Sequence, residues 1–359
     1  MKKLIIRALA GLLASVLLVV GVAMIGNMPN GKRTDGVFYQ ASGIHPDATL
    51  MTVNKQSVSA EEYLYWLAYD CDYLTSYMGS VDFDAAVSGS LTYGQYAQED
   101  AQRTVVLYAV VRQWAQQAGI TLSEESQAQL DAQRQQYVTY YGGEEGYAQQ
   151  LELMGLTDEG FQQINQVYFL YSELYKAYCT AGGALRPSDE EIASFAQGSS
   201  YCTFLPLYWS ITGDETTDAA TLAQAQDAVA RLRSAEDVTA AYLQIAQEMA
   251  LQTSETGETA AAQDLDTSVA AVLTTLAEGQ VSDVVTTANG YYVFVGQALN
   301  TDAVLDKMFN AKLDAMREGA GIRYNCRSYD KLDVARFYTK LQTLRSQLQS
   351  ASSDTAPQS

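Results

Sequence analysis

Residues 276–295, LAEGQVSDVVTTANGYYVFV, decide the fold of this chain. The stretch begins at the end of an amphipathic run. Gly279 follows, where a left-handed helix cap costs least for a residue without a Cβ atom. Asn289-Gly290 is a strong turn signal. The next five residues, YYVFV, have the aromatic and β-branched composition of a strand. The stretch therefore predicts a helix end, a turn, a short extended segment, a second turn and a final strand.

The same stretch follows the pattern L-x-x-G-x-(I/V)-S-x-x-V-x-T-x-x-G-(Y/W)-H, placed before a hydrophobic strand. The residues that match it in order and spacing are Leu276, Gly279, Val281, Ser282, Val285, Thr287, Gly290 and Tyr291. The stretch thus resembles the C-terminal half of a parvulin-type (PpiC-like) peptidyl-prolyl isomerase domain. The family's histidine, which follows Gly-Tyr, is replaced here by Tyr292.

The resemblance implies an α+β fold for residues 186–300: a four-stranded antiparallel sheet with flanking helices. Such a domain lowers the barrier of about 18–20 kcal/mol that amide resonance sets against prolyl isomerisation. An apolar pocket grips the proline ring and lets the amide twist. We expect the elements of this domain at residues 202–211 (first strand), 221–234 and 238–250 (helices), 250–266 (polar loop) and 269–276 (helix).

In this family, two histidines and a Cys or Asp lie beneath the pocket. Counted back from Thr212, the first histidine position falls near Leu207, within two residues, and residues 201–214 contain no histidine. The second position is Tyr292. Carried over position by position, the resemblance predicts the substrate-binding residues Leu207, Leu265, Val269, Leu273, Leu276 and Tyr292. It assigns no catalytic residue, because the polar cluster is missing.

Two positions keep a second interpretation. Tyr292 could donate a hydrogen bond through its hydroxyl, or it is an ordinary half-buried strand aromatic. Asp264 and Leu265 are all that remains of the family's G-G-D-L-G turn at residues 262–266. Asp264 could belong to the site or only cap the next helix.

A second resemblance lies in the N-terminal half. Residues 51–63, MTVNKQSVSAEEY, are similar to the opening strand and first helix of SurA- and PrsA-type foldases. Ser59 and Glu62 have the spacing of a capping box. Apolar residues at helical spacing predict further helices near residues 93–118, 123–140, 147–154 and 157–180. We therefore expect a helical, SurA_N-like chaperone domain over residues 50–185.

The C-terminal part completes that domain in the foldase resemblance. Residues 301–349 predict a helical segment that packs back on the N-terminal domain. Its short strand near Ile322 is expected beside the strand near Met51. Residues 350–359 are polar and small, and are expected to form a disordered tail.

The chain opens with a targeting pattern. Three basic residues precede an uncharged run over residues 8–25. That run exceeds the ~7–15 residues of a signal-peptide core and approaches the ~20 of a spanning helix. We predict a signal anchor, a single transmembrane helix, over residues 1–30, and a stalk over residues 31–49. The remaining domains would lie outside the cytoplasm. Cleavage near residues 21–23, GVA, is the alternative and gives a secreted protein.

Charge and composition exclude several classes of partner. The formal net charge is −20, and all 42 acidic residues follow the predicted anchor. Such a surface repels nucleic acid and anionic lipid. His45 is the only histidine and no CxxC spacing occurs, so neither a metal site nor a cofactor is predicted. The state of the cysteines is left open between disulfides and free buried thiols. They are Cys71, Cys179, Cys202 and Cys326.

Three functions fit these patterns. The first is a non-catalytic foldase or chaperone that binds unfolded exported polypeptides, and the missing histidines favour it. The second is a working peptidyl-prolyl isomerase with an altered site. The third is a non-enzymatic envelope scaffold or binding protein that uses the same fold.

Overall fold

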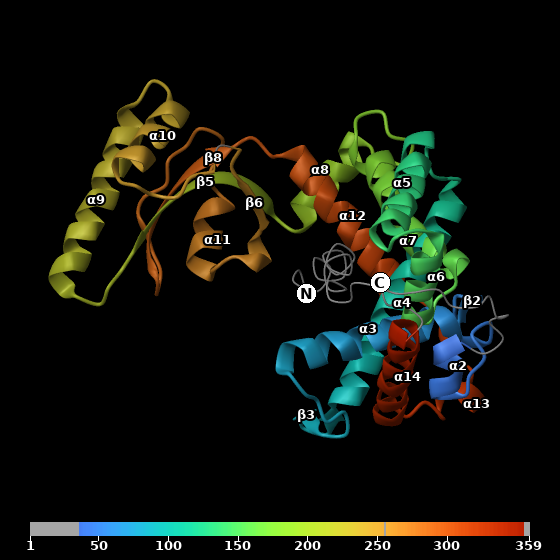
Figure 1. Cartoon of the computed structure of the whole chain (residues 1–359). Coiled ribbons are helices and arrows are strands. Elements are labelled where there is room, and N and C mark those ends of the chain that lie inside the picture. The colour runs from blue at the N-terminus through green and yellow to red at the C-terminus, as the bar shows by residue number, and fades with distance from the viewer. Residues whose placement is uncertain (1–35, 255, 355–359) are drawn as a thin grey trace. The chain divides into compact units, whose positions relative to one another are not determined.

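The computed structural model describes residues 36–254 and 256–354. The predicted signal anchor, residues 1–30, lies outside them. In the part of the chain that the structure describes, no helix is both long and apolar enough to cross a membrane. The fold is mixed α and β and rich in helix. The chain forms two compact units: unit 1 comprises Met1–Lys176 and Leu313–Ser359, and unit 2 comprises Ala177–Lys312 (Figure 1).

Unit 1 is mostly helical. Its helices are α2 (Gly36–Ser42), α3 (Ala60–Met78), α4 (Tyr93–Ala118), α5 (Glu124–Tyr140), α6 (Glu144–Met154), α7 (Asp158–Cys179, whose last residues belong to unit 2), α13 (Cys326–Tyr329) and α14 (Val334–Asp354). Its strands are β1 (Thr49–Val53), β2 (Gln56–Ser59), β3 (Ala86–Ser88), β4 (Leu91–Thr92) and β9 (Ile322–Tyr324). The capping residue predicted at Ser59 is confirmed, because its hydroxyl accepts from the Glu62 amide at 3.1 Å.

A three-stranded sheet of order β2-β1-β9 joins the two ends of unit 1. The predicted pairing of the C-terminal strand is confirmed, since Met51 lies opposite Tyr324 in an antiparallel register. The β1–β2 turn lies at Asn54-Lys55. Both residues have positive φ, 51° and 71°, as a tight hairpin turn requires. The Asn54 side chain also accepts from the Gly321 amide at 2.8 Å.

The prediction of a stalk over residues 31–49 has to be corrected for residues 36–49, which the structure describes. Within it, α2 is a helix whose Val37, Phe38 and Ala41 are buried. Surrounding Gly, Pro and Asp residues hide this short apolar pattern in the sequence. The tail also begins later than predicted, because α14 continues to Asp354.

The last helix, α14, is fixed in unit 1 by one aromatic contact and one polar cluster. Phe337 packs against Phe38 of α2 with ring centroids 6.0 Å apart. The carboxylate of Asp72 on α3 accepts from Tyr338 at 2.8 Å and from Arg345 at 2.9 Å. Arg345 also donates to the Leu153 carbonyl of α6 at 2.8 Å. The two Asp72 contacts join residues that are 266 and 273 positions apart in the sequence.

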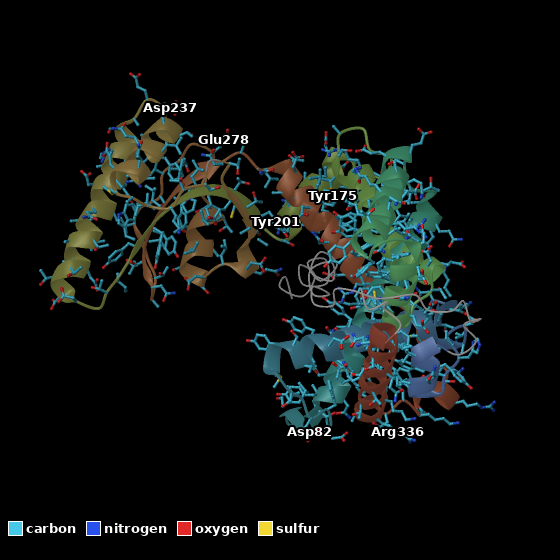
Figure 2. The ribbon with its side chains drawn as sticks, viewed as in Figure 1. Asp82, Tyr175, Tyr201, Asp237, Glu278 and Arg336 are labelled. Carbon is cyan, nitrogen blue, oxygen red and sulfur yellow. The ribbon has the colours of Figure 1, made fainter. Side chains whose placement is uncertain are left out.

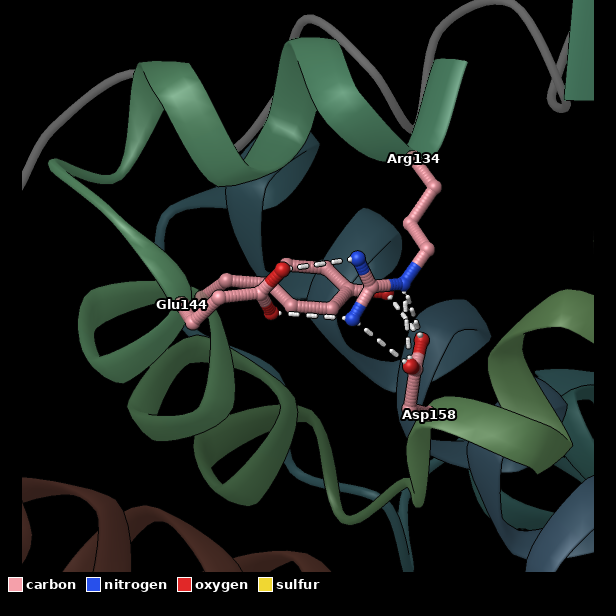
Figure 3. Close-up of polar contacts among 4 residues, drawn as sticks. Arg134, Glu144 and Asp158 are labelled. Atoms are coloured by element: carbon pink, nitrogen blue, oxygen red, sulfur yellow. Dashed lines mark hydrogen bonds and ion pairs between the residues drawn. The ribbon is translucent and has the colours of Figure 1, made fainter. Parts of the chain in front are cut away.

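A charged cluster connects α5, α6 and α7 (Figure 3). Arg134 of α5 donates two hydrogen bonds of 2.9 Å to Glu144 at the start of α6, and one of 3.0 Å to Asp158 at the start of α7. The guanidinium also lies 5.1 Å from the ring centre of Tyr147. Its hydrogen bonds hold the pKa of the Glu144 carboxyl below its usual range. Both carboxylates stand in first helical turns, where negative charge is favourable.

Unit 1 also buries an acid without an ion-pair partner, and this gives a testable pH dependence. Burial, with Asp100 nearby, raises the pKa of Asp70 well above its usual range. One of its carboxyl oxygens has no hydrogen-bond partner among the described residues. The folded state therefore favours the protonated acid. That contribution to stability is present below the ordinary Asp pKa of about 4 and is lost as pH rises towards the folded pKa.

We therefore expect Asp70→Asn to raise the free energy of unfolding of unit 1 at pH 7 by about 1–2 kcal/mol. The gain should vanish below about pH 4, where Asp70 is protonated in both states. Urea unfolding at pH 7 and pH 3.5 measures both values. Asp84→Asn, at an exposed position, is the control and should change neither. A loss of stability at pH 7 would contradict the expectation.

Unit 2 contains a four-stranded sheet. Its helices are α8 (Asp189–Gly198), α9 (Glu215–Ser234), α10 (Val238–Glu248), the 3-10 turn η1 (Ala262–Asp264), α11 (Thr267–Leu273) and α12 (Thr301–Glu318, whose last residues belong to unit 1). Its strands are β5 (Tyr201–Ser210), β6 (Glu258–Ala261), β7 (Val285–Thr286) and β8 (Gly290–Gln297). Figure 2 labels Tyr201, where β5 begins. Residues 250–266, predicted as a loop, contain β6 and η1 instead.

The sheet has the order β6-β5-β8-β7, and each neighbouring pair is antiparallel. Helices α9 and α10 cover one face and α11 covers the other (Figure 1). Side chains alternate along β5, so Leu205 and Leu207 pack under α9 and α10, whereas Phe204 packs under α11. The sheet therefore separates two apolar cores, one under α9 and α10 and the other under α11.

The structure determines the pairing state of the four cysteines. No disulfide joins any of the four, all of which lie in described residues. Cys71 is buried, and burial raises the pKa of its thiol.

Candidate functional site

A pocket of about 870 Å³ opens on unit 2. Its floor is formed mainly by the α11 face of β5 and β8. Its walls are Thr221 and Gln224 of α9, residues 250–254, Glu258 of β6, residues 264–269 and the turn at residues 287–289. All of these lie in one unit. A pocket of this size falls in the range that holds small ligands or a few residues of a peptide.

The floor is aromatic. Phe294 is 1% exposed and stacks on Tyr292, with centroids 5.5 Å apart and planes at 9°. Phe204 meets Phe294 edge to face at 5.4 Å. Pro206, two residues after Phe204 on β5, lies directly opposite Phe294 of β8. This surface can take an apolar ring by dispersion and by burial of apolar area.

Two tyrosines face each other across β5 and β8 at the edge of the floor. Tyr208 lies directly opposite Tyr292 in the β5–β8 register. Their ring centroids are 4.6 Å apart. The hydroxyl of Tyr208 donates to the Asn289 carbonyl at 2.7 Å, which fixes its ring against the turn. Tyr208 is the pocket residue next to Leu207, near which the sequence analysis places the first histidine position.

Leu207 itself is not brought to the pocket. It is 0% exposed and belongs to the core under α9 and α10. The reason is the two-residue period of a strand, since a shift of one position moves a side chain to the opposite face. Any contact between Leu207 and a substrate would need the sheet to open.

The other predicted residues divide into two groups. Leu265, Val269 and Tyr292 line the pocket. Leu273 is 2% exposed and lies in the core beneath α11, and Leu276 packs against the same core. These two leucines support the pocket from behind.

The Tyr292 hydroxyl is neutral and available. Burial, followed by the nearby Tyr208, raises the pKa of Tyr292. No residue within 36–254 or 256–354 forms a hydrogen bond with this hydroxyl. A neutral phenol can both donate to and accept from a bound peptide. It cannot take over a proton at neutral pH as histidine does.

One wall of the pocket is held by a buried tyrosine on the opposite face. The Tyr242 hydroxyl of α10 donates to the Pro206 carbonyl at 3.2 Å and accepts from the Ser254 amide at 3.2 Å. Tyr242 is 0% exposed. It therefore ties the segment after α10 to β5 at the point where β6 no longer pairs with that strand.

Sequence reasoning missed Phe204, Pro206, Tyr208 and Phe294 as pocket residues. The signal was present as alternation in FLPLYW, residues 204–209, because every second residue lies on one face. The family pattern quoted above includes residues of β8 and none of β5. Elsewhere in the described residues, no cluster of His, Cys, Asp and Glu could hold a metal ion.

A four-stranded antiparallel sheet with α9 and α10 on one face, and α11 over an aromatic pocket on the other, defines a parvulin-type isomerase domain. Residues 214–308 match the family model described as the PPIC-type PPIASE domain. Residues 214–308 therefore form a parvulin-type, PpiC-like domain within this chain. The match begins after β5, so the strand that carries Tyr208 lies outside it.

Several solved structures are similar to this chain, and no curated protein matches it. PrsA from Bacillus subtilis has 14% identity and a TM-score of 0.28, with 69% of this chain and 91% of that chain covered. The foldase protein PrsA from Streptococcus pneumoniae has 16% identity and a TM-score of 0.21, with 72% and 92% covered. A structure titled for the SurA-like chaperones PEB4 and Cj1289 of Campylobacter jejuni has 13% identity and a TM-score of 0.20, with 77% and 98% covered.

Proposed function

We propose that this protein is an extracytoplasmic foldase of the parvulin family that binds unfolded exported polypeptides, with weak or lost catalysis. One observation carries the proposal: the aromatic pocket is formed, and two facing tyrosines, Tyr208 and Tyr292, lie in it. We assign these tyrosines to the positions of the two family histidines. The floor of Phe204 and Phe294 suits a proline ring. The paired phenols would replace the family's polar cluster of histidines and a Cys or Asp.

Unit 1 supplies a second surface that suits unfolded chains. Near the end of α3, Tyr73 and Tyr77 are 49% and 82% exposed, and their rings stack at 6.5 Å. Met78 is 45% exposed and Tyr96 of α4 is 38% exposed. Exposed apolar side chains gathered in one region are typical of interaction sites. This supports a chaperone domain over residues 50–185, completed by residues 301–349.

The proposal includes export and anchoring. The uncharged run of residues 8–25 after three basic residues supports a signal anchor. The site would then face unfolded polypeptides outside the cytoplasm.

The test of this function separates binding from catalysis. We expect the full chain to bind a fluorescent Ala-Ala-Pro-Phe peptide while leaving its cis–trans exchange, followed by NMR, unchanged. Tyr208→Ser should weaken binding about tenfold or more, because it removes an aromatic wall of the pocket. Leu243→Ser, at a 40% exposed position on α10, is the matched control and should bind as the parent does. An unaltered affinity in Tyr208→Ser, or no binding by the parent, would contradict the proposal.

The working isomerase stays as the second candidate because of the available Tyr292 hydroxyl. If the parent accelerates exchange and Tyr292→Phe does not, the hydroxyl serves the reaction and the protein is an isomerase with an altered site. The Tyr292→Phe change keeps the ring that stacks on Phe294, so it separates the hydroxyl from the floor of the pocket.

A further inference from the structure

The rim of the unit 2 pocket carries only negative charge. Glu258 of β6, Asp264 of η1 and Asp266 at the start of α11 all line it and are exposed. Their charges reach the floor, because Glu258 and Asp266 both contribute to raising the pKa of Tyr292. The acidic rim and the aromatic floor are therefore parts of one site.

Two of the three carboxylates are unengaged. Asp266 accepts from the amide and hydroxyl of Ser268, at 2.8 and 2.6 Å, and so caps α11. By contrast, the side chains of Glu258 and Asp264 make no hydrogen bond or ion pair with any residue in the described ranges. Each has a full carboxylate to offer to a ligand.

No basic side chain of the described residues lines the pocket. Unit 2 has few cations, and they are engaged elsewhere. Arg231 pairs with Glu248 at 2.7 Å and Arg233 with Asp283 at 2.8 Å. The others contact groups outside the pocket: Arg186 donates to the Cys179 carbonyl, Lys307 lies near Asp306, and Lys312 lies over the Tyr178 ring. The negative field at the rim is therefore not compensated locally.

Resting on the proposed function, we infer that this pocket selects polypeptide segments in which a Lys or Arg directly flanks the proline. The proline ring takes the Phe204–Phe294 floor. The neighbouring cation then reaches Glu258 and Asp264 across a short rim, and the faces of Tyr208 and Tyr292 add a favourable surface for it. An acidic flanking residue would meet like charge and is selected against.

The expected preference is about three- to tenfold in Kd for Lys-Pro over Ala-Pro peptides at low salt, because exposed charge pairs contribute modestly. Glu-Pro peptides should bind more weakly than Ala-Pro peptides. The preference should shrink as salt rises, since these charges are solvent-exposed. Fluorescence anisotropy with labelled peptides that differ at one position, and the full chain in a nonionic detergent, measures these ratios.

A pair of variants separates the rim from the overall negative charge of the protein. In Glu258→Gln/Asp264→Asn the Lys-Pro to Ala-Pro ratio should fall to about one. Asp266 is left in place because it caps α11. Glu236→Gln/Glu278→Gln removes the same charge from exposed positions outside the pocket and should keep the preference (Figure 2 labels Glu278).

The outcomes distinguish the inferred preference for Lys-Pro and Arg-Pro segments from the proposed function. Equal affinity for Lys-Pro, Ala-Pro and Glu-Pro peptides overturns the inference and leaves the proposed function standing. An equal loss of preference in both double variants assigns it to net charge and also overturns the inference. Absence of binding by every peptide overturns the proposed function itself, and the inference with it.

Discussion

Replacing Phe294 with alanine is expected to lower the free energy of unfolding of unit 2 by about 3–5 kcal/mol. The side chain is 1% exposed, and it is held between the edge of Phe204 and the face of Tyr292. Its removal loses the transfer free energy of the ring and leaves a cavity that a strand backbone cannot close. The backbone is fixed there, because the Phe294 amide donates to Ser282 Oγ at 2.9 Å.

Urea unfolding followed by hydrogen exchange of β5 and β8 amides measures this loss in unit 2 directly, since two units need not unfold in one step. Leu243→Ala at an exposed position is the control and should cost less than about 1 kcal/mol. A Phe294→Ala loss as small as that of the control would mean that the floor is not packed as the structure has it. Because the floor also holds the proline ring, peptide binding should fall together with stability.

Phe337→Ala is expected to have an effect of similar size on unit 1. Phe337 is 1% exposed and packs on Phe38, which is 0% exposed. The pair joins α14 to α2, so truncation removes a contact between the two ends of the described chain. We expect a loss of about 3–5 kcal/mol, with early exchange of α2 and α14 amides.

The control for this prediction lies on the same helix. Lys340→Ala is at an exposed position and should change the unfolding free energy by less than about 0.5 kcal/mol. If α2 and α14 exchange no faster in Phe337→Ala than in the control, the C-terminal helix is not held by this aromatic contact.

The fold of unit 2 could be predicted from residues 276–295 because several of them make local hydrogen bonds or close contacts that only their residue type allows. Ser282 bonds both the amide and the carbonyl of Phe294. The Thr287 hydroxyl donates to the Gly290 carbonyl at 3.0 Å and so closes the turn. A Cβ at Gly290 would lie 2.1 Å from the Trp209 carbonyl oxygen, so only glycine fits there. Each of these contacts needs a particular residue type at a fixed spacing, and both can be read from the sequence.

The pocket was harder to predict because it depends on register between distant strands. That Tyr208 faces Tyr292 follows from a pairing across 84 positions, and an error of one residue selected Leu207 instead. The carboxylates of Glu258 and Asp264 are ordinary surface acids in the sequence. Only the fold brings them to an aromatic floor without a cation nearby. In the same way, α2 was not predicted, because its apolar residues become part of a core only by packing against α14.

The β1–β9 pairing also sets the order in which the chain can fold. Asn54 finds its partner Gly321 only after 267 further residues have been synthesised. Until then, one edge of β1 has open backbone donors and acceptors, of the kind that invite wrong pairing. Unit 2 lies within one continuous segment, Ala177–Lys312, and can form earlier during synthesis. During its synthesis, this protein therefore passes through a stage in which one edge of β1 is still unpaired while unit 2 can already be folded.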